Sequence, residues 1–231
     1  MQHNILSIFK NGYYVQFLPL ILYPLTQNIL LSATITLKMF PTNCMFWYSH
    51  KYDYAFADRR YNQLKQFVRF TDTGYLASIL AIISPAYIPL AFNTHFAITF
   101  GYWIAKIALG LDDVDRTNGQ EYDVAFERLL GGLIHGLPLT ILTYKIVHDP
   151  YREDTCPYYF SPQDLMMSYA WLWTWFLGVY IPWRIRTGDP VYGFMDLKEP
   201  HIYKIAGFLL MHVLLAVSNM TGRYIYEYGS H

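Results

Sequence analysis

The side chains that could do chemistry in this sequence are few, and most of them lie inside long apolar segments. Arg69 and Asp72 are three residues apart near the start of one such segment. A helix would bring them to one face, either as a neutralised ion pair or as contacts for a ligand. Lys106 lies in the next apolar segment. Its ammonium group can snorkel to an interface, reach Asp112 or Asp113, or form an interior polar site.

Two histidines, His135 and His212, lie inside two further apolar segments. Such a pair could hold a haem only at matching depth and facing one another, so we expect hydrogen-bonded core histidines instead. The histidines form no HxxxH or HxxHH cluster, which argues against a membrane di-iron enzyme. The acidic loop 112–116 lacks the spacing and glycine of a calcium loop, and Cys44 and Cys156 predict two unpaired thiols. We therefore expect no metal site.

The composition is that of a membrane protein rather than a soluble one. Hydrophobic residues make up 54% of the 231 residues and aromatic residues 19%, both above the soluble norm. Charged residues make up 15%, and they cluster between the apolar segments. The formal net charge of +0 gives no indication of a nucleic-acid partner.

The segment 165–197 is the most informative stretch of the chain. It contains an aromatic, nearly uncharged run of about twenty residues, the length of a membrane-spanning helix, which ends in Trp183, Arg184 and Arg186. Tryptophan and arginine at the end of such a run are typical of the bilayer interface. Ser161, Pro162 and Asp164 lie just before it and predict a capping box at the helix start.

Hydropathy predicts an all-α, polytopic membrane protein with six helices in a single domain, 1–231. No repeat, low-complexity tract or linker divides the chain. We expect Pro85 near the end of the second helix and a very short link between the second and third, which makes them a helical hairpin. The expected helices span about 13–37, 67–90, 92–111, 129–147, 165–185 and 203–226.

Basic residues predict the orientation of these helices. With six spans, eleven lysines and arginines fall on one side and four on the other, so the loops 38–66, 112–128 and 186–204 would face the cytosol or a mitochondrial matrix. Lys145 and Arg223 would then lie on the opposite side of the membrane.

Several short motifs resemble the androgen-induced family of small multi-pass membrane proteins. The segment 66–72 is similar to the start of that family's second helix, and His135 with Gly136 is similar to its His-Gly helix start. A later element matches the family's T-G-x-x-V-Y-x-F pattern at Thr187, Gly188, Val191, Tyr192 and Phe194. The resemblance covers about residues 66–197 and implies a helical membrane fold.

The resemblance also implies a chemistry, from which this chain departs at both key positions. Animal members are hydrolases of fatty-acid esters of hydroxy fatty acids, with a Thr nucleophile and a His. Those positions fall on Arg69 and Pro138 here, and neither can act as nucleophile or base. Thr73 and His135 each lie about one turn away, so the enzyme hypothesis assigns Thr73 as nucleophile and His135 as base.

The alternative, which we favour, is a non-catalytic, lipid-associated accessory subunit of a larger membrane complex. Its partners would be membrane lipids, including bound phospholipid, and other membrane-protein subunits. The hypothesis places Arg69, Asp72, Lys106 and His212 as polar groups that face lipid or an interior cavity. The expected location is the mitochondrial inner membrane or the endoplasmic reticulum. A channel or transporter is disfavoured, because no pair of broken helices recurs in two halves.

Overall fold

The computed structural model describes residues 68–108, 121–148, 159–188 and 201–229. Every regular element in these ranges is helical, which confirms the all-α class for the part of the chain described. In chain order the elements are α5 (Phe70–Ile83), η2 (Pro85–Tyr87), α6 (Ile88–Ala108), α7 (Glu121–Val147), α8 (Pro162–Trp175), the π-helical η4 (Phe176–Tyr180), α9 (Ile181–Thr187) and α10 (His201–Tyr228).

The break between α5 and α6 falls earlier than the sequence predicted. We expected the second helix to continue to residue 90, but α5 ends at Ile83 and Ser84 is extended, with φ −145° and ψ 128°. The cause is Pro85, because a proline ring disfavours the helical conformation of the residue before it. One 3₁₀ turn, η2, then leads into α6, so the short link of the predicted hairpin is present.

The capping box at the start of α8 is confirmed. The Ser161 hydroxyl accepts a hydrogen bond from the Asp164 N–H at 3.3 Å, and the Asp164 carboxylate accepts one from the Ser161 N–H at 2.8 Å. From Pro162 the chain stays helical to Thr187 through α8, η4 and α9. Gly188 ends this long helix with φ +73°, a left-handed cap that glycine adopts without strain.

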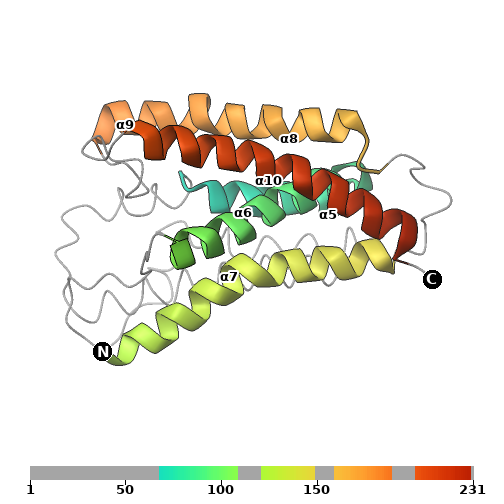
Figure 1. Cartoon of the computed structure of the whole chain (residues 1–231), viewed down its shortest axis with the longest axis horizontal. Coiled ribbons are helices and arrows are strands. Elements are labelled where there is room, and N and C mark those ends of the chain that lie inside the picture. The colour runs from blue at the N-terminus through green and yellow to red at the C-terminus, as the bar shows by residue number, and fades with distance from the viewer. Residues whose placement is uncertain (1–67, 109–120, 149–158, 189–200, 230–231) are drawn as a thin grey trace, which may run out of the picture.

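Helix α6 lies at the centre of the bundle and contacts α5, α7, α8 and α10. Figure 1 shows α8, α9 and α10 together along one side, α7 along the opposite side, and α5 and α6 between them. The Ser78–His95 hydrogen bond joins α5 to α6, and the Asn93–Ser218 bond joins α6 to α10. Because α6 packs on four neighbours, all of its residues from Ile88 to Thr99 are buried.

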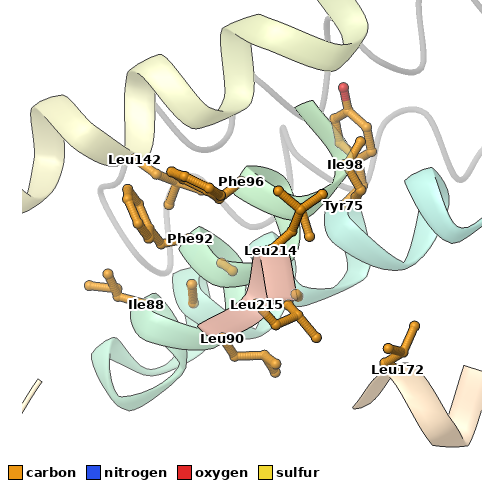
Figure 2. Packing of buried hydrophobic residues seen from close by; sticks show 14 of the residues in the cluster. Tyr75, Ile88, Leu90, Phe92, Phe96, Ile98, Leu142, Leu172, Leu214 and Leu215 are labelled. Carbon is orange, nitrogen blue, oxygen red and sulfur yellow. The ribbon is translucent and has the colours of Figure 1, made fainter. Parts of the chain in front are cut away.

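The apolar core forms around this central helix. Figure 2 shows Phe92 and Phe96 of α6 within it, with Leu142 from α7, Leu172 from α8 and Leu215 from α10. Each of these leucines is at most 1% exposed, so α7, α8 and α10 each contribute a fully buried side chain to one continuous core around α6.

Within the described residues, one helix is both long and apolar enough to cross a bilayer, and it spans Lys204–Tyr228. Two shorter apolar helices span Phe70–Ile83 and Gly132–Val147. The expected arrangement of six spans therefore stays a prediction. The first expected helix, 13–37, lies outside the described residues.

Candidate functional site

His135 forms the centre of a polar cluster where α5, α6 and α7 meet. Its Nε2 lies 3.4 Å from the hydroxyl oxygen of Thr71. The ring of Tyr102 stacks on the imidazole with centroids 3.9 Å apart and an interplanar angle of 3°. The ammonium of Lys106 donates to the Tyr102 hydroxyl at 3.1 Å and lies 5.6 Å from the Trp103 ring centroid. The imidazole of His135 thus has a hydroxyl on one side and an aromatic ring stacked on it, and that ring's hydroxyl in turn bonds to an ammonium group.

Pro138 explains why neighbouring helices donate hydrogen bonds to α7 at this point. A proline inside a helix has no N–H for the carbonyl four residues earlier, which here belongs to Ile134. The Tyr75 hydroxyl of α5 donates to that carbonyl oxygen at 2.8 Å. The Thr99 hydroxyl of α6 donates to the next carbonyl, that of His135. The orientation of His135 is thus fixed by the backbone around Pro138 and by side chains of two other helices.

The threonine that the structure brings to His135 is Thr71. The hydroxyl of Thr73, the nucleophile of the enzyme hypothesis, donates to the Phe70 carbonyl oxygen at 2.7 Å. The two threonines are two positions apart, so their side chains leave α5 about 200° apart around the helix axis. The assignment of Thr73 as nucleophile stays a prediction, and among the described contacts it is the Thr71 hydroxyl that approaches His135.

The other predicted polar residues of this region lie at the helix ends. Arg69 is the exposed residue at the start of α5, and its carbonyl oxygen accepts the Asp72 N–H at 3.0 Å. The predicted ion pair between their side chains is not among the contacts of the described residues. Lys106 is half-buried over the rings of Tyr102 and Trp103. Its expected partners at 112 and 113 lie outside the described residues.

His212 of α10 belongs to an aromatic cluster on the α8 side of the bundle. Its Nδ1 lies 2.8 Å from the Phe208 carbonyl oxygen. Its ring lies 5.4 Å from that of Tyr169 and 5.9 Å from that of Trp173. Over the ranges that the structure describes, no group of three His, Cys, Asp or Glu side chains could hold a metal ion.

A polar network that the sequence did not predict joins α6, α8 and α10. Asn93 of α6 donates from Nδ2 to Ser168 of α8 and to Asn219 of α10, each at 3.0 Å. Its Oδ1 accepts from the Ser218 hydroxyl at 2.8 Å. All four side chains are buried. The sequence feature that could have indicated this network is an asparagine at the centre of an apolar segment, because polar side chains in such segments commonly hydrogen-bond across helices.

Asn219 extends this network to the turn before α8. Its Nδ2 donates to the carbonyl oxygens of Phe160, at 2.9 Å, and Ser161, at 3.3 Å. Phe160 has φ +62°, a left-handed conformation that is unfavourable for a residue with a Cβ. Its ring fits against Gly222, where an added Cβ would come within 2.3 Å of it. The hydrogen bonds and the glycine together hold this turn in place.

Residues of the family motif fall partly inside the described structure. In α7 the Gly136 carbonyl accepts a hydrogen bond from Thr140 at 3.3 Å. Thr187 donates to the Trp183 carbonyl at 2.8 Å, one residue before the cap at Gly188. The remaining motif positions, Val191, Tyr192 and Phe194, lie outside the described residues.

Comparison of the chain with protein-family models, with curated protein sequences and with solved structures found no match. The resemblance to the androgen-induced family therefore stays a prediction from its motifs.

Proposed function

We propose that this chain is an integral membrane protein and a non-catalytic, lipid-associated accessory subunit of a larger membrane complex. The observation that carries the proposal is the outer face of α10. Ile205 is 61% exposed, Leu209 59%, Val213 56% and Met220 73%. With Val217, which is 43% exposed, they recur every three or four residues and so form one apolar stripe along the helix. A stripe of this kind is stable against lipid and unfavourable in water.

The inner face of the same helix has the opposite character. Ser218 is fully buried and Asn219 is 7% exposed, and both bond to Asn93 of α6. Apolar side chains outside and hydrogen-bonded polar side chains inside are the pattern of a helix packed within a bilayer. The apolar helix has 25 residues and is therefore about 37 Å long at 1.5 Å per residue. That length exceeds a hydrocarbon core of about 30 Å.

The long helix formed by α8, η4 and α9 supports the same proposal. Met166 is 70% exposed and Leu177 58% exposed, on a helix whose buried residues include Ser168 and Trp175. Such a face suits either lipid or the transmembrane helix of a partner subunit. The polar groups of the Asn93 network bond to one another, which supports a structural role for them. The expected locations remain the mitochondrial inner membrane or the endoplasmic reticulum.

Two measurements on source membranes test this proposal. The chain should remain in the pellet after alkaline carbonate extraction. After gentle solubilisation it should migrate on a native gel with a complex many times its 27.1 kDa mass. Release by carbonate would refute the membrane assignment. Retention with migration as a monomer or small oligomer would refute the subunit assignment alone.

One observation favours an intramembrane lipid-ester hydrolase as the second candidate, and that is the approach of Thr71 to His135. A threonine needs a base within hydrogen-bond reach to act as a nucleophile, and 3.4 Å is a loose contact of the kind seen without substrate. In this alternative Thr71 takes the place of Thr73. Thr71→Ala should then abolish ester hydrolysis and Thr73→Ala should not. Equal activity of the Thr71 variant and the natural protein would exclude the hydrolase.

A further inference from the structure

Lys204, in the first turn of α10, has a buried ammonium group with no hydrogen-bond partner in the described structure. An ammonium removed from water is among the most unfavourable groups to leave without an acceptor. An anion bound at this position would compensate for the lost hydration.

The aromatic contacts between α8 and α10 show which residues share the level of Lys204. The ring centroids of Tyr169 and His212 are 5.4 Å apart. Those of Trp173 and Phe176 are each 4.9 Å from the ring centroid of Phe208. Higher numbers on one helix thus pair with lower numbers on the other, so the two helices are antiparallel. Each further turn along α9 therefore lies at the level of an earlier turn of α10, and Figure 1 shows α9 at the end of the bundle where α10 begins.

This register brings a group of basic residues to one end of the bundle. It places Lys204 near the level of Tyr180, with Arg184 and Arg186 of α9 one to two turns further toward that end. Arg186 is exposed and Arg184 half-buried. Trp183 lies in the same turn of α9 as these arginines. Basic side chains with tryptophan and tyrosine at a helix end are typical of the lipid headgroup level.

Helix α6 ends at the same level. It too is antiparallel to α10, because Asn93 bonds to Ser218 and a Cβ at Gly101 would lie 3.5 Å from the Met211 sulfur. Trp103, near the end of α6, is 40% exposed. By this register the end of α6 lies at the level of Lys204, and Trp103 lies near the level of Phe208, about one turn further into the bundle.

We propose that Lys204 and Arg186 bind the phosphodiester group of an anionic phospholipid at this end of the bundle. The proposal rests on the membrane embedding proposed above and adds the class and position of the lipid. A phosphodiester provides charged oxygen acceptors for the buried ammonium and for the exposed guanidinium. The charge rule also places this end of the helices on the cytosolic or matrix side, where the leaflet carries anionic lipid.

The test uses the full-length protein reconstituted in phosphatidylcholine vesicles. Spin-labelled phosphatidylglycerol and spin-labelled phosphatidylcholine are added separately, and the motionally restricted fraction gives the relative association of each with the protein. The natural protein should prefer phosphatidylglycerol. Lys204→Gln should lower that preference about fivefold, the effect of one basic side chain near an anionic surface. Lys204→Arg, which keeps the charge, should retain most of it.

The matched control is Lys145→Gln. Lys145 lies in the last turn of α7. Val147, two residues further on, would contact a Cβ at Gly229 at 3.3 Å, so Lys145 lies near the opposite end of α10. This variant should keep the preference. Equal losses in the Lys145 and Lys204 variants, or no preference in the natural protein, would overturn the proposal. Loss of the preference on adding inorganic phosphate at constant ionic strength would assign the site to free phosphate instead.

Carbonate extraction separates this proposal from the one on which it depends. If the protein stays in the membrane pellet and shows no preference for the anionic lipid, only the headgroup site fails. If the protein is released, the membrane assignment fails and the lipid site fails with it.

Discussion

The hydroxyl of Tyr75 donates a hydrogen bond of 2.8 Å to the carbonyl oxygen of Ile134, the carbonyl that Pro138 leaves without its helical donor. A side chain of α5 thus completes the backbone hydrogen bonding of α7. In a bilayer this contact matters more than it would in water, because no solvent can replace the missing donor. It also fixes how α7 is seated against α5, and with it the position of His135.

Removal of this donor should destabilise the bundle, and the loss should depend on Pro138. Tyr75→Phe should lower the free energy of unfolding in detergent by about 1–3 kcal/mol, because a buried carbonyl is left unsatisfied. Chemical denaturation followed by far-UV circular dichroism measures this change. Tyr144→Phe, on the exposed side of α7, should stay within about 0.5 kcal/mol.

A double-mutant cycle decides whether Pro138 is the reason. In a Pro138→Ala background the restored N–H of residue 138 can bond to the Ile134 carbonyl, so Tyr75→Phe should cost less there. A cost that is the same in both backgrounds would show that the tyrosine stabilises the protein through its packing alone.

The Asn93 network gives a second prediction about stability. Asn93→Ala should lower the free energy of unfolding by about 2–4 kcal/mol, because it leaves a cavity and removes partners from Ser168, Ser218 and Asn219. Thr94→Val, at the neighbouring buried position, should cost less, because the Thr94 hydroxyl bonds only to Leu90 of its own helix. Asn219→Ala combined with Asn93→Ala should cost less than the sum of the single changes. Strict additivity would argue against a coupled network.

Two glycines should respond in opposite ways to the same substitution. Gly222→Ala should destabilise the protein by about 1–3 kcal/mol, because the new methyl group would come within 2.3–2.6 Å of three Phe160 ring carbons. Gly136→Ala meets nothing within 4 Å, and alanine favours a helix by up to about 1 kcal/mol. Melting temperatures of the two variants in detergent provide the comparison. A Gly222 variant as stable as the natural protein would show that the Phe160 turn is not packed as described.

Substitutions on the inner and outer faces of the long helix should distinguish effects on folding from effects on assembly. Trp175 is 6% exposed, and its Nε1 donates to the Val68 carbonyl at 2.7 Å. Trp175→Ala should therefore cost about 3–5 kcal/mol and weaken assembly only by weakening the fold. Leu177→Ala, on the outer face, should leave the melting temperature unchanged and reduce co-migration with the complex on a native gel. Unchanged co-migration of the Leu177 variant would remove this face from the partner contact.

Features set by local sequence were predicted correctly. The capping box at Ser161 follows from three nearby residues, and the helical class follows from long apolar runs with polar segments between them. The exact end of α5 was missed, although its cause is also local: Pro85 acts on Ser84, and the apolar pattern on both sides concealed the break. Hydropathy is insensitive to single residues of this kind.

Relations between helices could not be predicted in the same way. The choice between Thr71 and Thr73 at His135 depends on how α5 is rotated against α7, and no pattern within α5 contains that information. The Asn93 network likewise joins residues up to 126 positions apart. Each of its members alone looks like an isolated polar residue in an apolar segment. Long-range packing, rather than local propensity, determines which of these groups meet.

The π-helical turn at Phe176–Tyr180 has a consequence for how this sequence can change by insertion or deletion. In this turn the Ile181 N–H reaches back five residues to the Phe176 carbonyl, next to Pro182, which has no N–H to donate. The turn thus holds one residue more than an α-helical turn. Five residues of a π turn cover about the same rotation as four residues of an α-helix, so deletion of one residue here would leave a continuous α-helix with everything beyond it on the same face. Arg184 and Arg186 would then still face the same side of the helix. A related chain shortened by one residue at this point should therefore keep its basic residues on the same face of α9.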